Sequence, residues 1–134
     1  MQTDAIAHNI KTDGEVGATF HIEPNHNPKA GEEAQAWFAL TRKGGDPLPA
    51  SACECELQVY DSNGNLILEP EVTAIDAETY EDIPGANMVF PAAGSYELVL
   101  TGRPSDGANF EPFQLSYTVN ATGDRVSTST TPAT

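Results

Sequence analysis

Two cysteines separated by a single residue are the side chains best suited to chemistry in this chain of 134 residues. Cys53 and Cys55 are its only thiols, and they begin a segment, residues 53–60, that we expect to be a β-strand. Side chains two positions apart on a strand point to the same face. The two sulfurs should therefore lie side by side, and copper is the cofactor that we consider for such a pair of soft ligands.

Three interpretations of this pair follow from the residues. The face that carries Cys53 and Cys55 continues into Leu57 and Val59, so both thiols can simply pack in the core. Two thiolates can also hold Cu(I), although they fall short of the four ligands of a structural zinc site. A disulfide would need a bulge at Glu54, because Cα atoms two positions apart on a flat strand are ~6.7 Å apart, at the outer limit for bridging.

Two histidines are the other candidate metal ligands. His21 alternates with apolar neighbours in a predicted strand, so we expect its side chain to point to solvent. His26 follows in a loop with a proline near each end, which stiffens it. The two side chains can share a site only if the end of the strand and the loop fold back on each other. His8 lies in the polar N-terminal segment, and we expect it to take no part.

The sequence shows no constellation typical of catalysis. It contains no Gly-x-Ser-x-Gly elbow, no His-Glu-x-x-His zinc motif and no glycine-rich phosphate loop. We therefore expect a protein that is not an enzyme and has no catalytic residues.

The charge balance limits the partners. Twenty acidic residues oppose six basic ones, which gives a net charge of -14. Such a field repels the phosphate backbone of nucleic acids and attracts cations and basic proteins. We expect no nucleic-acid binding, and we expect the partner to be another protein.

Alternating apolar and polar residues predict a fold built from strands. The clearest strands are residues 113–120 and 94–100, which we expect to pair as a C-terminal hairpin. Residues 78–85 are rich in acids and predict a loop or a single helical turn. About seven short strands with turn residues between them are typical of an immunoglobulin-like antiparallel β-sandwich. Trp37 and Phe38 are neighbours in one of these strands, so one of them must lie off the core face, where an exposed aromatic would suggest an interface.

Composition divides the chain into three parts. We expect a flexible N-terminal arm at residues 1–15, the β-sandwich domain at residues 16–121, and a disordered tail rich in Ser, Thr and Pro at residues 122–134. Such a tail can lead to a membrane tether that this chain does not contain. No stretch of the sequence approaches the ~20 apolar residues of a membrane span.

Several segments together resemble a known group of domains. They are a first strand that ends in proline at residues 20–24, Ala30-Gly31, a Gly-Asp-Pro-Leu turn at residues 45–48, and a late segment at residues 90–98. This order resembles the immunoglobulin-like domains of the YtkA and FixH families and, more distantly, copper carriers of the CopC type. The resemblance implies a periplasmic or otherwise extracytoplasmic protein, often tethered to a membrane and connected with copper handling or oxidase assembly.

The chain departs from the copper carriers in its ligands. It has only two methionines, Met1 and Met88, so it cannot form a methionine-rich Cu(I) site. It also lacks a histidine at the N-terminus. Our expectation is a non-enzymatic extracytoplasmic binding or assembly module. The alternative is a copper-binding accessory protein that uses Cys53 and Cys55, with His21 or His26 as a further ligand.

Overall fold

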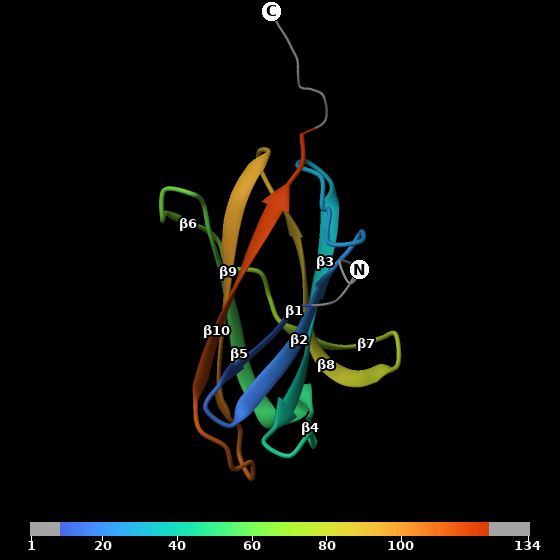
Figure 1. Ribbon diagram of the computed structural model, residues 1–134, viewed down its shortest axis with the longest axis vertical. Helices are drawn as coiled ribbons and strands as arrows, with labels where there is room; N and C mark the ends of the chain where they lie inside the picture. Colours follow the sequence, from blue (N-terminus) through green and yellow to red (C-terminus); the bar gives the residue numbers. More distant parts are fainter. Residues whose placement is uncertain (1–8, 124–134) are drawn as a thin grey trace, which may run out of the picture.

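The computed structural model describes residues 9–123, which form two antiparallel β-sheets packed against each other (Figure 1). Its strands are β1 (Asn9–Asp13), β2 (Val16–Ile22), β3 (Glu33–Arg42), β4 (Pro47–Leu48), β5 (Cys53–Tyr60), β6 (Leu66–Leu68), β7 (Thr73–Ala77), β8 (Tyr80–Val89), β9 (Gly94–Pro104) and β10 (Phe113–Ala121). A 3-10 turn at Ala50–Ala52 precedes β5. No helix within residues 9–123 is long and apolar enough to cross a membrane.

The strand order defines the two layers. One sheet has the order β1–β2–β3–β8–β7, with β4 added beside β3, and the other has the order β10–β9–β5–β6. This arrangement confirms the predicted antiparallel β-sandwich, and the β9–β10 pair confirms the predicted C-terminal hairpin. The described residues contain ten strands, where the sequence predicts about seven.

The extra strands lie where the sequence predicts irregular chain. Residues 9–13 fall in the predicted flexible arm, but they form β1 because each of them pairs with a residue of β2, from Asp13 opposite Val16 to Asn9 opposite Phe20. The predicted loop or helical turn at residues 78–85 is wrong, since β8 begins at Tyr80 and forms a hairpin with β7. At the other end, Thr122 still bonds to Pro28 and Ala30. The rest of the predicted tail, residues 124–134, lies outside the described residues, as do residues 1–8.

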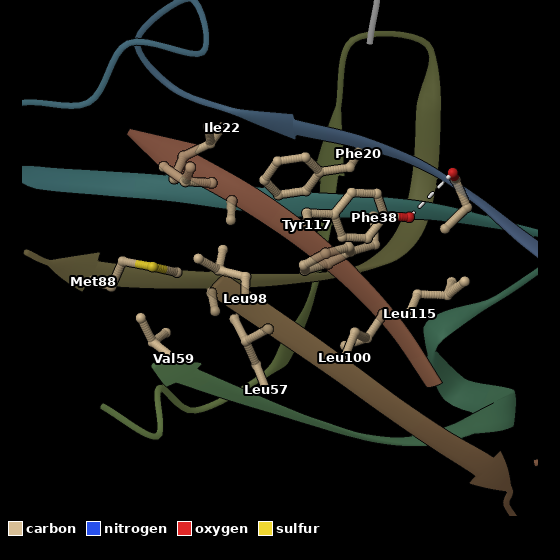
Figure 2. Packing of buried hydrophobic residues seen from close by; sticks show 14 of the residues in the cluster. Phe20, Ile22, Phe38, Leu57, Val59, Met88, Leu98, Leu100, Leu115 and Tyr117 are labelled. Atoms are coloured by element: carbon tan, nitrogen blue, oxygen red, sulfur yellow. Dashed lines mark hydrogen bonds between the residues drawn. The ribbon is translucent and has the colours of Figure 1, made fainter. Parts of the chain in front are cut away.

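Three aromatic rings in mutual contact, those of Phe20, Phe38 and Tyr117, lie in the core between the sheets (Figure 2). The ring centroid of Phe20 is 5.2 Å from that of Phe38 and 4.5 Å from that of Tyr117, and the centroids of Phe38 and Tyr117 are 5.8 Å apart. The hydroxyl of Tyr117 donates a hydrogen bond across the sandwich to the carbonyl of Ala18, at 3.3 Å, which the dashed line in Figure 2 marks. This hydrogen bond satisfies the one polar group of the three rings, so they join the two sheets without leaving a buried hydroxyl unpaired.

A second, smaller apolar cluster lies on the outer face of the first sheet. Phe38 faces the core, so its neighbour Trp37 faces outward, yet Trp37 is only 1% exposed. It packs with Ala39 and with Ile83 of β8, and Ile75 of β7 borders the cluster. The β7–β8 hairpin projects beside the sandwich in Figure 1, and its side chains shield the tryptophan. The outward aromatic is therefore buried and forms no exposed interface.

Truncating Ile83 should remove part of the packing that buries Trp37. Ile83→Ala leaves a cavity beside Trp37, and we expect it to lower the free energy of unfolding by about 2–4 kcal/mol. Ile10→Ala is the matched control, because Ile10 is 70% exposed and its truncation should change stability by less than about 0.5 kcal/mol. Urea unfolding measured by the fluorescence of Trp37 tests both variants. Equal effects of the two substitutions would contradict the second cluster.

Alkaline pH should destabilise the protein through Tyr117. Burial raises the pKa of Tyr117 to about 12 from its ordinary value of 10.0. Because the unfolded chain releases this proton first, the stabilisation is complete below pH ~10 and is lost as the pH rises towards 12, by up to about 2–3 kcal/mol. The difference in unfolding free energy between wild type and Tyr117→Phe should therefore shrink over this range. A difference that stays constant from pH 9 to pH 11.5 would contradict the raised pKa.

Candidate functional site

His21 is the centre of a cluster on the outer face of the first sheet. The register of β2 on β3 places His21 directly opposite Trp37, and the two rings stack with centroids 5.1 Å apart and planes at 27°. His21 is only 7% exposed. The prediction that it points to solvent is therefore wrong. Alternation puts the side chain on the outer face as expected, but Trp37 and the following turn cover that part of the sheet.

The turn after β2 brings His26 back onto His21. The amide of His26 donates a hydrogen bond to the carbonyl oxygen of Ile22 at 2.7 Å. The amide of Asn27 donates one to the carbonyl oxygen of Pro24, also at 2.7 Å. Asn25 and His26 adopt left-handed backbone conformations, with φ of 51° and 59°. The chain thus reverses immediately after the strand, and the two imidazole rings meet edge to face with centroids 4.4 Å apart. This is the folding back that a shared site requires.

Glu23 adds a carboxylate to the two imidazoles. Its Oε2 accepts a hydrogen bond from Nε2 of His21 at 2.8 Å, and its side chain is 49% exposed whereas that of His21 is 8% exposed. The amide of Glu23 still pairs with the carbonyl of Gln35, so the strand geometry continues through residue 23. Residues 21 and 23 therefore share the outer face. We call His21, Glu23, His26 and Trp37 the histidine cluster.

The ligand types in the histidine cluster suit a borderline metal ion. Imidazole and carboxylate groups together bind Cu(II) and Zn(II). Two ligands at right angles, each ~2.1 Å from a metal, are about 3 Å apart, which is close to the observed separation of His21 Nε2 and Glu23 Oε2. Within residues 9–123, however, no group of three or more His, Cys, Asp or Glu side chains is gathered closely enough to hold a metal ion.

The two cysteines lie elsewhere and are bonded to each other. Cys53 and Cys55 form a disulfide whose Cα atoms are 5.3 Å apart, nearer than on a flat strand. Of the three interpretations of the sequence, the structure has the disulfide, and neither sulfur can act as a thiolate ligand while this bond is intact. β5 begins at the end of the sandwich remote from the turn that follows β2 (Figure 1), so the disulfide and the histidine cluster are separate.

A glycine on the neighbouring strand makes room for the disulfide. Gly102 of β9 lies opposite Cys55. A Cβ atom at this position would come within 2.8 Å of Sγ of Cys53 and within 2.5 Å of the ring of Phe113. The half-buried disulfide therefore fills the end of the core next to Phe113, a structural role that differs from metal binding.

Sequence reasoning missed two members of the histidine cluster. Glu23 follows His21 by two residues, so strand alternation was a signal that could have placed both on one face. Trp37 could not be found in this way, because its position beside His21 depends on the register of two strands that are separated in sequence. Tyr80 continues the line of rings from His21 through Trp37, with its ring centroid 5.4 Å from that of Trp37.

Comparisons with known proteins identify the fold. No protein-family model matches the chain, and no curated protein matches it. Among solved structures, it is similar to a DUF4426 family protein from Pseudomonas aeruginosa, with a TM-score of 0.63 and 12% identity over 87% of this chain and 99% of that chain. It is also similar to FetP from uropathogenic Escherichia coli strain F11, with a TM-score of 0.63 and 16% identity over 87% and 94% of the two chains.

A third similar structure is the copper-reconstituted P19 protein from Campylobacter jejuni, with a TM-score of 0.62 and 14% identity over 87% and 94% of the two chains. At these identities the likeness shows the β-sandwich fold. The resemblance to copper-carrier sandwiches therefore agrees with the solved structures at the level of architecture. The YtkA and FixH resemblance stays a prediction.

Reducing the disulfide should weaken the fold modestly. Loop closure over the Cys53–Cys55 segment predicts a loss of about 1–2 kcal/mol in the free energy of unfolding on reduction. Urea unfolding with and without a phosphine reductant tests this. The Cys53→Ser/Cys55→Ser variant is the control, since its unfolding midpoint should not respond to the reductant. Two reactive thiols in the non-reduced wild type would contradict the bond.

Proposed function

We propose that this protein is a non-enzymatic, extracytoplasmic binding module that holds copper at the histidine cluster. The observation that carries the proposal is the 2.8 Å contact between Nε2 of His21 and Oε2 of Glu23, with the imidazole of His26 packed against that of His21. The sequence predicted copper at Cys53 and Cys55, with His21 or His26 as a further ligand. Because the two cysteines form a disulfide, the histidines are the better ligands.

Three further features support copper as the ion. Among first-row divalent metals a given nitrogen and oxygen site binds Cu(II) most tightly. The net charge of -14 raises the local concentration of cations around the protein. Copper-bound structures of FetP and P19 share the fold, which supports the proposal only by analogy of architecture.

The aromatic member of the cluster offers a direct test. Trp37 is the only tryptophan of the chain, and its ring stacks on His21. Paramagnetic Cu(II) quenches tryptophan fluorescence at contact distance, whereas Zn(II) does not. We expect one equivalent of Cu(II) to quench most of the emission of the oxidised protein, and excess Zn(II) to compete without quenching.

Substitution of each histidine tests where the copper ion binds. His21→Phe keeps a ring stacked on Trp37 but removes the nitrogen ligand, and His26→Phe does the same in the turn. Each should weaken Cu(II) binding by at least about tenfold, since even the loss of an outer-shell partner costs that much. The Cys53→Ser/Cys55→Ser variant should bind as wild type does.

Two outcomes would overturn the proposal. One is the absence of saturable quenching in wild type. The other is equal quenching in wild type and both histidine variants, because the ion would then occupy the general acidic surface. Loss of binding only in the cysteine variant, measured after reduction and with Cu(I), would move the site back to the Cys53–Cys55 pair.

A further inference from the structure

A hollow of about 440 Å³ opens on the outer face of the first sheet. Thr19 and Ala39, which oppose each other on β2 and β3, form its floor, and Tyr80 and Ile83 of β8 form one wall. The hollow lies next to the histidine cluster, because Tyr80 and Ile83 also contact Trp37. We call it the outer hollow.

The outer hollow is lined mostly by apolar groups and is open to solvent. Its lining includes alanine, leucine, isoleucine and proline side chains, threonine methyl groups and the ring of Tyr80. Of the described residues that line it, only Glu81 is charged. Pro47, Pro49 and Thr79 also line it and are exposed, so an occupant can enter from outside. Concave sites of this size and composition are typical of ligand binding.

Ile10 continues the apolar surface beyond the outer hollow. It lies opposite Thr19 in the β1–β2 pair, and opposed residues of an antiparallel pair project to the same face. Its side chain is 70% exposed, the highest value among the large apolar residues of the described part of the chain. An occupant that covers both the hollow and Ile10 must run across several strands, which favours an extended chain segment over a compact small molecule.

The charge on the wall of the outer hollow defines the chemistry of this segment. The β7–β8 hairpin carries Asp76, Glu78, Glu81 and Asp82, and residues 73–89 contain no Lys or Arg. A segment with complementary charge is therefore basic. The net charge of -14 has the same sign as the hairpin, so it attracts a basic partner from a distance and opposes a second copy of this chain.

Hydrogen bonds hold the hairpin against the sandwich, so the outer hollow is preformed. Oδ1 of Asp76 accepts a hydrogen bond from the amide of Asp82 at 2.9 Å, and Oδ2 of Asp82 accepts one from the hydroxyl of Ser51 at 2.9 Å. Ser51 belongs to the 3-10 turn before β5, so this second bond joins the hairpin to the body of the domain. A preformed site requires little ordering when a partner binds.

We propose that the outer hollow is the docking site for a basic, extended segment of a partner protein. Apolar side chains of that segment fill the hollow and cover Ile10, and its Lys or Arg side chains face the acidic hairpin. The inference goes beyond the proposed function, because this docking needs no metal and none of its contacts is a proposed ligand of copper.

A synthetic peptide of alternating Lys and Leu tests the proposal. A length of about seven residues spans ~23 Å when extended. The peptide is titrated into the isotope-labelled full chain in the presence of a chelator, and nuclear magnetic resonance follows the backbone amides. We expect saturable shifts at Thr19, Ala39 and Tyr80. Control peptides with Ser in place of Leu, or Glu in place of Lys, should bind at least about tenfold more weakly.

Two substitutions test the floor and the wall separately. Thr19→Phe fills the hollow with a ring and should weaken binding at least about tenfold. Its matched control is Thr118→Phe, at an exposed position of β10 in the second sheet. Glu81→Lys reverses a charge on the wall and should weaken binding at least about threefold. Glu56→Lys, at an exposed position of β5, makes the same change in net charge, and both controls should bind within about twofold of wild type.

Four outcomes would overturn the inference. They are the absence of saturable shifts in wild type, shifts spread over both sheets, wild-type binding by Thr19→Phe, and equal weakening by Glu81→Lys and Glu56→Lys. Concentration-dependent shifts at the same amides without peptide would also overturn it, because the occupant would then be a second copy of the chain. Cu(II) binding is measured separately by quenching of Trp37, so this inference and the proposed function can fail independently.

Discussion

Burial of both faces of the β2–β3 pair is the constraint on which the rest of the structure depends. Phe20 and Phe38 oppose each other on one face of this pair, and His21 and Trp37 oppose each other on the other. Strand alternation allows no arrangement in which one layer covers all four rings. The second sheet covers the phenylalanines through Tyr117, and the β7–β8 hairpin and the turn after β2 cover the outer pair. The histidine cluster forms where the turn after β2 covers His21 on this outer face.

The sequence predicts well those strands that have one buried and one exposed face. It fails for segments that become strands only through contacts with residues distant in the sequence. Residues 113–120 alternate without error, because one of their faces meets the core and the other meets solvent. Residues 80–85 carry no such pattern, yet they join β8, since Ile83 is buried by contact with Trp37. Residues 9–13 are similar: their polar composition suggests an arm, and only the partner strand β2 makes them a strand. Local sequence does not contain these long-range pairings.

The candidate ligands could be predicted from the sequence, but their arrangement and the position of Trp37 beside them could not. His21 and His26 are candidates by residue type, and Glu23 follows from alternation. The approach of His26 to His21 depends on left-handed backbone at Asn25 and His26, which is uncommon for non-glycine residues overall, although Asn and His adopt it more often than most. The disulfide shows the same limit. A flat strand holds alternate Cα atoms at the outer limit for bridging. Those of Cys53 and Cys55 are only 5.3 Å apart, and Gly102 leaves space beside the sulfur of Cys53.

The disulfide and the histidine cluster are chemically consistent with each other. Disulfides persist in oxidising compartments, where the stable form of copper is Cu(II), and Cu(II) prefers nitrogen and oxygen ligands to the thioethers and thiolates that select Cu(I). Because Cys53 and Cys55 are bonded to each other, neither offers a thiolate to a metal ion. The imidazoles and the carboxylate of the histidine cluster remain as ligands. The proposed copper site at His21 and His26 fits an oxidising compartment for the same reason that such a compartment disfavours Cu(I) at the cysteines. In a reducing compartment the preference would reverse, because free thiolates would outcompete imidazole for Cu(I).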